Sequence, residues 1–447
     1  MADIPADVVS KAKLHVLDTL GCAFGGFRNG AKTAVEAAET SLGGPAEATV
    51  IGEGRKVSAL TALLINGSMV RYLDANDITV GGHDSEIIPG AIAVGERQGS
   101  SGADVLTSVI AGYELAARFR LSAAAAGDAV NNSELEVRGF NNDLRAGFVM
   151  PAVFGRLLGL DSGQIANAIG TSGSRALLLG IIDASKEENT LAKNLRFPLG
   201  SYLALVCTYL AQGGLTGPAA VIEGHMGLNE TILDGQMDLE ILTDYGSEWY
   251  FRQTSIKGLS ACYSTHGQAQ AIINLRKRVS LDPDDIESIH LVTNSRSLWH
   301  TGDPATRRRV RNKETADHSS FYIAAIALLY GTVGPQHYRE DLYRDARVIS
   351  LMDKVTIEAD DGRYKPVYPG SRVEIMLTDG TRYVEEALHP RGHYLNPMTA
   401  GDIEEKFASM ADGLLSEQQR RDVIALTREL DRAADLSDLM AAVAIDG

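Results

Sequence analysis

Apolar residues recur every three or four positions through most of the first 250 residues, which is the period of a helix with one buried face. The clearest of these stripes consists of Leu106, Val109, Ile110, Tyr113 and Ala117. Residues 199–211 are almost all apolar and predict a helix that is buried on most sides. This part of the chain is therefore expected to be helical.

The pattern changes after about residue 280, where polar and apolar residues alternate as in a half-buried strand. The alternating runs are residues 288–292, 354–358, 372–378 and 381–385. Asp379–Gly380 stands between the last two runs, and an Asp-Gly pair in this position is typical of a β-hairpin turn. The apolar run FYIAAIALLY at residues 321–330 predicts a buried helix among the strands, so we expect a smaller α/β unit here.

The end of the chain returns to a helical pattern. Ser416 and Gln419 have the spacing of a capping box that begins a helix, and residues 436–443 predict another short one. We therefore expect a mainly α fold with a smaller α/β lid domain. Residues 1–255 and 400–447 would form the helical domain, and residues 260–395 the lid.

The chain carries 58 acidic residues against 42 Lys and Arg, which gives a formal net charge of −16. This balance argues against nucleic acid and anionic membrane surfaces as partners. Cys22, Cys207 and Cys262 lie far apart without CxxC spacing, so we expect a reducing compartment and no iron–sulfur cluster. No apolar signal segment opens the chain, and no apolar run approaches the roughly 20 residues of a membrane span. These features predict a cytoplasmic protein with no membrane contact.

Five polar clusters could carry chemistry, and the first is the segment of residues 73–86. It holds Asp74 and His83 beside Gly81–Gly82, a pair that would let the backbone approach a ligand closely. Histidine titrates near neutral pH and is therefore the natural acid or base of this segment. Because Asp and Asn also favour turns, the alternative is a plain loop between two helices.

The other clusters each bring cations, histidines or hydroxyl groups together: Lys193 and Arg196, then Lys257, Cys262 and His266, then His318 and Tyr322, and last His389 and His393. For Lys193 and Arg196 the alternative is the solvated start of a helix. For Cys262 the alternative is a buried residue that acts as a small apolar side chain. No dinucleotide fingerprint, phosphate-binding loop, HExxH or GxSxG motif occurs. No His, Cys or carboxylate spacing indicates a metal site either, so we expect none.

Five stretches of the chain together resemble the MmgE/PrpD family, which includes 2-methylcitrate dehydratase, cis-aconitate decarboxylase and iminodisuccinate epimerase. The stretches are residues 4–22, 73–86 with Gly-Gly-His-Asp-Ser, 213–219 (GGLTGPA), 257–266 and 389–397. The resemblance implies a large all-helical domain completed by the C-terminal tail, with a smaller α/β lid. It also implies a homodimer that works without a metal or an organic cofactor.

The resemblance carries over residue by residue. Positions that match the family's site are Asp74, His83, Lys193, Lys257 and Tyr322. The chain departs from the family pattern at Ile78, where the decarboxylase has Thr, at Phe140–Asn141 and Cys262, where it has His, and at Arg196, which replaces a usual His. These departures argue against cis-aconitate decarboxylation and leave the substrate open within the family.

The family chemistry removes a proton next to a carboxylate, so the site must stabilise a dianion with fixed positive charge. We expect a dehydratase of a small hydroxy di- or tricarboxylate such as 2-methylcitrate, with His83 as base and Tyr322 or Lys257 as acid. The residues expected to bind the anionic substrate are Asp74, Lys193, Arg196 and His266. All should converge on one cleft between the two domains, where cations outnumber carboxylates.

Two other functions compete with dehydration. An epimerase would need two acid/base groups on opposite faces of one carbon, and His83 with Lys257 could supply them. A non-catalytic binding protein could keep the fold, but the complete set of polar site residues argues against it.

Overall fold

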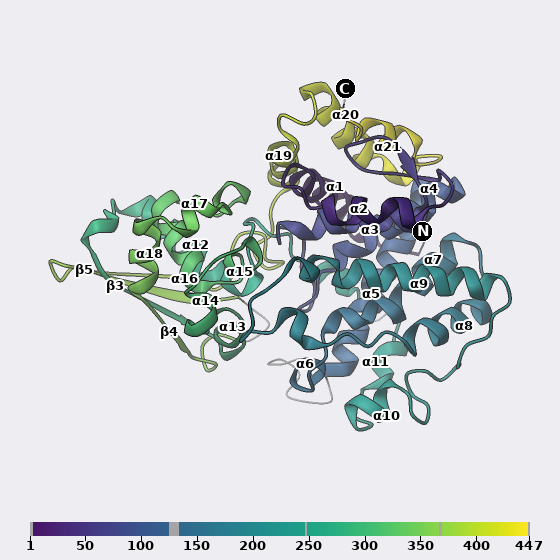
Figure 1. Cartoon of the computed structure of the whole chain (residues 1–447), viewed down its shortest axis with the longest axis horizontal. Helices are drawn as coiled ribbons and strands as arrows, with labels where there is room; N and C mark the ends of the chain where they lie inside the picture. The colour runs from purple at the N-terminus through teal and green to yellow at the C-terminus, as the bar shows by residue number, and fades with distance from the viewer. Residues whose placement is uncertain (1–2, 125–133, 246–247, 366–368, 446–447) are drawn as a thin grey trace.

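The computed structural model describes residues 3–124, 134–245, 248–365 and 369–445. The body of the molecule is helical (Figure 1). Its helices are α1 (Ala6–Arg28), α2 (Thr33–Leu42), α3 (Ala59–Tyr72), α4 (Ile87–Gln98), α5 (Gly102–Ala124), α6 (Glu134–Val137), α7 (Ala146–Leu157), α8 (Ser162–Gly173), α9 (Arg196–Gln212), α10 (Leu228–Leu233) and α11 (Leu239–Thr243). A two-stranded antiparallel pair, β1 (Ala48–Thr49) and β2 (Lys56–Val57), lies between α2 and α3.

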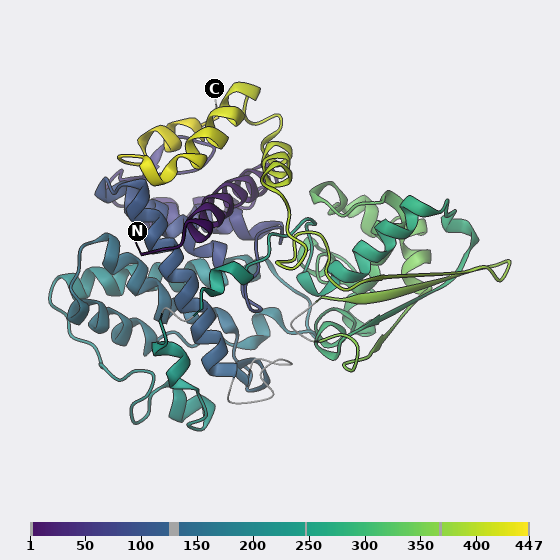
Figure 2. The same ribbon diagram turned by 180° about the vertical axis from the view of Figure 1, so that it is seen from behind.

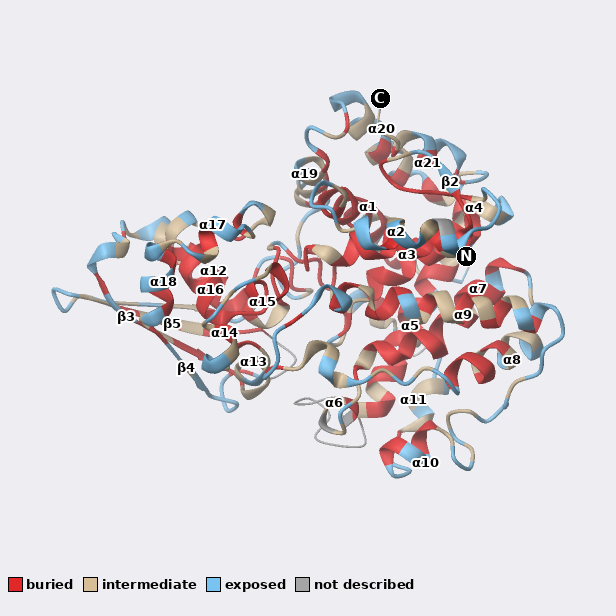
Figure 3. Cartoon of the chain, viewed as in Figure 1, coloured by how far each residue is buried: buried red, intermediate tan, exposed pale blue. Residues whose placement is uncertain are grey.

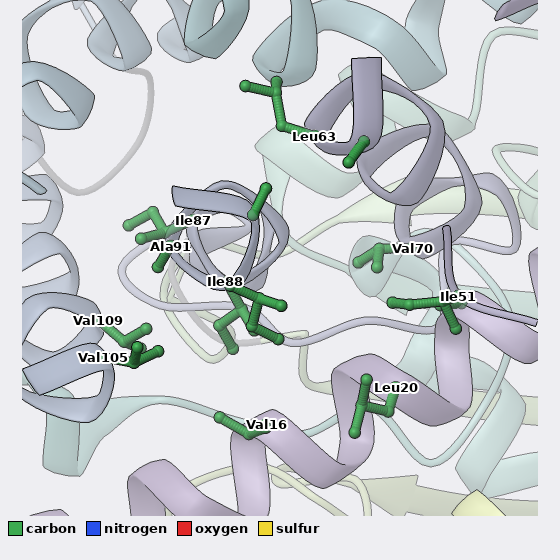
Figure 4. Close-up of a cluster of buried hydrophobic side chains, with 14 of the residues drawn as sticks. Val16, Leu20, Ile51, Leu63, Val70, Ile87, Ile88, Ala91, Val105 and Val109 are labelled. Atoms are coloured by element: carbon green, nitrogen blue, oxygen red, sulfur yellow. The ribbon is translucent and has the colours of Figure 1, made fainter. Parts of the chain in front are cut away.

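Helices α1, α3, α4 and α5 meet in one hydrophobic core, which confirms the helical stripes (Figure 4). All five residues of the predicted stripe on α5 are buried. Around them lie Val16 and Leu20 of α1, Val70 of α3 and Ile88 of α4. Each such side chain contributes about 1.5–3 kcal/mol when it leaves water. On α1, a Cβ at position 26 would collide with the backbone carbonyl of Met69, so a glycine lets α3 approach closely.

The C-terminal tail returns to the helical body, as Figures 1 and 2 both show. It forms α19 (Ala400–Ala411), α20 (Glu417–Arg428) and α21 (Ser437–Ala442). Ser416 caps α20 through a capping box with Gln419, as predicted. Phe407 of α19 and Val423 of α20 are fully buried in the same core as α1. The helical body is therefore completed by residues from the far end of the chain.

The part of the chain between Lys257 and the tail is an α/β unit with its own hydrophobic core. Its helices are α12 (His266–Arg278), α13 (Ser295–Thr301), α14 (Pro304–Arg307), α15 (Lys313–Ala316), α16 (Ser320–Tyr330), α17 (Glu340–Tyr343) and α18 (Ala346–Asp353). Its strands are β3 (Ile286–Thr293), β4 (Val355–Ala359), β5 (Ser371–Leu377) and β6 (Arg382–Ala387), in the sheet order β4-β3-β5-β6. The fold is thus mainly α with a smaller α/β part, as predicted.

The predicted hairpin at Asp379–Gly380 joins β5 to β6, which pair antiparallel. Gly380 has a φ of +86°, which a glycine adopts without strain. Strand β3 pairs parallel with β4 and antiparallel with β5. Helices α12 and α16 lie on one face of the sheet, and α16 is buried over most of its length (Figure 3). No helix in the described ranges is long and apolar enough to cross a membrane.

Candidate active site

A pocket of about 320 Å³ lies between the helical body and the α/β part. One wall is the loop after α3 with the short helices η2 (Asn142–Arg145) and η3 (Gly180–Asp183) and the start of α9. The other wall comes from residues 262–264, α13 and the segment before α16. The ionisable groups that line it are Arg71, Asp74, His83, Arg120, Glu136, Asp143, Asp183, Arg196, Tyr250, Cys262, Tyr263, Arg296, His300, His318, His393 and Tyr394.

Asp74 is a buried carboxylate at the centre of a group of cations. It follows the end of α3 and has a φ of +49°, which is uncommon and strained for a residue with a Cβ. Arg71 Nη1 donates to its Oδ1 at 2.5 Å, and Lys257 Nζ donates to the same oxygen at 2.7 Å. Burial acts to raise the pKa of Asp74, but Arg71, Lys257 and Lys193 hold that pKa well below its usual value. The carboxylate is therefore ionised although it is buried.

His83 lines the pocket with one ring nitrogen fixed and the other free to act. Its Nδ1 lies 2.6 Å from the backbone carbonyl of Asp77, so Nδ1 carries the hydrogen and donates it there. Its Nε2 lies 3.6 Å from Asp74 Oδ1. Burial and the charges of Arg71 and Lys257 hold the pKa of His83 well below 6.5. The imidazole is therefore neutral, with the lone pair on Nε2.

The loop that presents His83 is held by a buried arginine. Arg120 donates to the carbonyl of Thr79 at 2.6 Å and to Asp84 at 2.7 and 2.8 Å. A Cβ at Gly82 would lie 2.5 Å from Arg120 Nη1, so the glycine is needed for this close approach. Gly81 and Gly82 both line the pocket, where the pair is predicted to approach a ligand, and Gly82 in addition makes room for a side chain of the protein.

Lys193 and Lys257 are fully buried and lie behind the lining of the pocket. Lys257 donates to both Asp74 Oδ1 and the Asp74 carbonyl, and to the Ala261 carbonyl at 3.2 Å. Lys193 lies 3.3 Å from Asp317 Oδ1 and 3.9 Å from Asp74 Oδ2. Both ammonium groups therefore hold buried carboxylates, and of these carboxylates Asp74 lines the pocket.

Arg196 begins α9, is buried and lines the pocket. The alternative that Lys193 and Arg196 belong to a solvated helix start is therefore wrong. Its guanidinium lies 3.0 Å from Asp143 Oδ2 and donates to Asp183. Among the described lining residues, four arginines face four carboxylates, so the expected excess of positive charge is not found there.

Tyr322 and His266 do not line the pocket. Tyr322 lies on α16, and its hydroxyl donates to the carbonyl of His337, inside the core of the α/β part. A proton donor must reach the substrate, so this placement argues against Tyr322 as the acid. His266 begins α12 with Nε2 3.2 Å from the Ala261 carbonyl, and burial together with Lys257 lowers its pKa to about 3.

Sequence reasoning missed several residues of the pocket, above all Asp183 and His300. His300 Nδ1 lies 3.7 Å from Cys262 Sγ, and His300 Nε2 lies 3.6 Å from Asp183 Oδ2. Nothing in the spacing along the chain connects these residues, because the fold alone brings them together. Arg71 could have been predicted as a site residue from the sequence. It lies three residues before Asp74, and residues three apart lie on the same face of a helix.

The departures from the family pattern share one location. Ile78, Asn141, Arg196 and Cys262 all line the pocket. A change at each of these positions alters the surface that meets a ligand.

Comparison with known proteins agrees with this architecture. The MmgE/PrpD N-terminal domain matches residues 1–240, and the MmgE/PrpD C-terminal domain matches residues 259–432. The chain is 26% identical to cis-aconitate decarboxylase of Aspergillus terreus, over 98% of this chain and 92% of that protein. It is 24% identical to the mitochondrial 2-methylcitrate dehydratase of Yarrowia lipolytica (94% and 83%) and 23% identical to 2-methylcitrate dehydratase of Escherichia coli (85% and 80%). The two domain matches together span most of the chain, which therefore belongs to the MmgE/PrpD family.

Proposed function

We propose that this protein is a lyase that dehydrates a small hydroxy di- or tricarboxylate, with 2-methylcitrate as the first candidate. Relatives named as dehydratases and decarboxylases support the reaction class. The observation that carries the proposal is the state of His83. Its Nδ1–H is bound to the Asp77 carbonyl, and its neutral Nε2 is open to the pocket.

His83 Nε2 is the base in this proposal. It would take the proton from the carbon next to a substrate carboxylate, and the resulting imidazolium would lie 3.6 Å from the ionised Asp74. That carboxylate stabilises the charged form of the histidine only once the proton has moved. The abstracted proton and the expelled hydroxide balance as water, and the other product is an unsaturated acid.

Arginines at the pocket wall support an anionic substrate. Arg71 and Arg196 line the pocket, and each guanidinium is fixed by a carboxylate of the protein. A guanidinium can bind a carboxylate through two parallel hydrogen bonds, which a lysine cannot do. Because these groups are already fixed, they stabilise the negative charge that develops on the substrate without reorganising.

Other family reactions receive less support from the geometry. The family resemblance implies histidines of the decarboxylase at Phe140–Asn141 and at Cys262, and Asn141 and Cys262 both line the pocket. For an epimerase, Lys257 would have to exchange protons with the substrate, yet its ammonium group already donates to three oxygens of the protein. Lys257 and His83 also face the same oxygen, Asp74 Oδ1, and not two faces of one substrate carbon.

The test is a substrate screen with the purified protein. It should be incubated with 2-methylcitrate, citrate, cis-aconitate and related hydroxy diacids in D₂O buffer. A new conjugated-alkene absorbance supports dehydration, and its absence with every acid contradicts it. Deuterium uptake without an alkene would identify an epimerase, and carbon dioxide release would identify a decarboxylase.

A further inference from the structure

Dehydration needs a proton donor at the pocket as well as a base. Hydroxide is a poor leaving group, so an acid must supply a proton as the carbon–oxygen bond breaks. Tyr322 and Lys257, the two acids expected from the sequence, do not line the pocket. The arginines that line it do not give up their protons in proteins. The donor is therefore to be sought among the histidines and tyrosines of the lining.

Several of these groups have no proton to give or hold it too tightly. His83 is neutral and is the proposed base. Burial lowers the pKa of His393 to about 4, so this ring is neutral as well. Burial raises the pKa of both Tyr250 and Tyr263 above its usual value, which makes each phenol a weaker acid. These groups do not fit the role of the donor, and His300 and His318 remain to be compared.

His300 lies on α13 and has a sulfur on one side of its ring and a carboxylate on the other. Its Nδ1 lies 3.7 Å from Cys262 Sγ, and its Nε2 lies 3.6 Å from Asp183 Oδ2. The second distance is beyond that of a hydrogen bond, so a hydrogen on Nε2 can be donated to a ligand. The side chain of His300 is 15% exposed, whereas that of His318 is 2% exposed. His300 is thus the more accessible of the two rings.

The charges around His300 favour an imidazolium beside a thiolate. Burial acts to raise the pKa of the Cys262 thiol, but the two neighbouring histidines hold that pKa well below its usual value. Burial acts to lower the pKa of His300, but Cys262 and Asp183 raise it to about 9. Arg296, on the same helix, is bound to Glu136 at 2.6 Å. At neutral pH His300 therefore carries a hydrogen on both ring nitrogens, and Cys262 carries none.

We propose, on the basis of the dehydration proposed above, that His300 is the acid of the reaction and that the Cys262 thiolate is its counter-ion. His83 takes the proton from carbon, and the electron pair of that C–H bond forms the alkene. The C–O bond breaks with its electron pair on oxygen, which takes the Nε2 proton of His300 and leaves as water. His83 then gives its proton to solvent, and His300 regains one from solvent.

The two groups come from different parts of the fold. His83 lies on the loop after α3 of the helical body, and His300 lies on α13 of the α/β part. The proton and the hydroxide leave from neighbouring carbons of the substrate. A base on one wall of the pocket and an acid on the other can therefore serve one bound molecule. Cys262 acts through His300 and is a positioning residue.

A leaving group that needs no proton separates this role from a structural one. The probes are 2-methylcitrate and its analogue with chlorine in place of the hydroxyl group, because chloride leaves without protonation. His300→Gln should lower kcat for 2-methylcitrate by about 10²–10⁴-fold. The same variant should keep the kcat of the unaltered protein for the chloro analogue. His83→Ala should lose activity on both probes, since both need the base.

His290→Gln is the matched control for this variant. His290 lies on β3 of the same α/β part and does not line the pocket, so its replacement should change neither rate. Where the screen selects another hydroxy acid, that acid and its own chloro analogue replace the two probes.

The pH profile tests the counter-ion. An acid works in its protonated form, so the kcat/KM of the unaltered protein should fall above about pH 9. Cys262→Ser removes a negative charge beside His300, so the alkaline limb should move to lower pH. Cys207→Ser, which replaces a buried cysteine of α9, should leave that limb in place. The ultraviolet absorbance of a thiolate should be present at neutral pH and absent from Cys262→Ser, and this measurement needs no substrate.

The outcomes separate this inference from the proposed function. Equal losses of His300→Gln on both probes, or no loss on either, would overturn the inference. An alkaline limb that Cys262→Ser leaves in place, or a protein without thiolate absorbance at neutral pH, would overturn the counter-ion. In each of these cases the unaltered protein still dehydrates its substrate. If it forms an alkene from none of the hydroxy acids, the proposed function fails, and the acid assigned to it fails as well.

Discussion

His83 and Lys257 face the same carboxylate oxygen, Asp74 Oδ1, from 3.6 Å and 2.7 Å respectively. One residue comes from the loop after α3 and the other from the beginning of the α/β part. Asp74 therefore links the proposed base to a buried cation. The roles of the two residues differ, since only the histidine lines the pocket.

Replacing the proposed base should abolish proton abstraction and leave the fold intact. We expect His83→Ala to lower kcat by about 10²–10⁴-fold on the substrate found in the screen, which is the usual contribution of a general base. The unfolding midpoint should change little, because His83 is only partly buried. His225→Ala, which removes an exposed histidine, is the control. Full turnover by His83→Ala would rule out this base.

The pH dependence of kcat/KM should reflect the perturbed histidine. A base works in its neutral form, and burial with nearby Arg71 and Lys257 holds the pKa of His83 well below 6.5. The neutral form of His83 therefore persists at acidic pH. We expect the acid limb of the kcat/KM profile to have its midpoint below pH 6.5. A limb centred at or above pH 6.5 would contradict this assignment.

Removing the buried cation should cost stability as well as activity. Lys257→Met leaves Asp74 with one partner fewer, and breaking a buried ion pair from one side costs about 3–5 kcal/mol. Urea unfolding of this variant should show that loss. The exposed Lys277 lies on α12, and Lys277→Met should have no such effect. An unchanged free energy of unfolding for Lys257→Met would mean that the pair does not stabilise the fold.

Glu86 predicts a pH-dependent contribution to stability. It is buried, and neither of its carboxyl oxygens has a hydrogen-bond partner in the described part of the chain. Burial, with repulsion from Asp143, raises its pKa from 4.5 to about 8. The folded protein therefore binds the proton more tightly than the unfolded chain, and this stabilisation is present below pH 4.5 and is lost as pH rises through 8.

Glu86→Gln should remove that loss, because the amide stays neutral at every pH. Thermal melts should be recorded for both proteins at pH 5 and pH 9. The melting temperature of the variant relative to that of the unaltered protein should be higher at pH 9 than at pH 5. Glu405→Gln, at an exposed position, should show no such gain. A Glu86→Gln protein whose relative stability is the same at both pH values would contradict the raised pKa.

The homodimer implied by the family resemblance stays a prediction. Light scattering on the purified protein should give a mass twice that of the chain. A mass equal to that of one chain would contradict it.

Local signals in the sequence predicted much of the fold, because helices and hairpins are set by short-range patterns. The Asp379–Gly380 turn and the Ser416 cap are examples, since both depend on neighbours within four residues. His300 and Asp183 could not be found in this way. They acquire a role only when α13 and η3 come together, and no sequence pattern records that contact.

Tyr322 shows how nearness in sequence can mislead. It lies four residues after His318, and no pattern in the sequence separates the two. Ser319 caps α16, so the helix begins between them and turns the tyrosine into the core of the α/β part. His318 precedes the cap and lines the pocket. The residue of this segment that reaches the pocket is therefore the histidine.

The buried ion pairs at the pocket cross from one hydrophobic core to the other. Lys257 reaches Asp74 at the end of α3, and Lys193 of the helical body reaches Asp317 of the α/β part. Neither part can melt first without leaving charges of its partner buried and uncompensated. The two cores are thereby coupled into one cooperative unit, and a calorimetric scan should show a single unfolding transition for the whole chain.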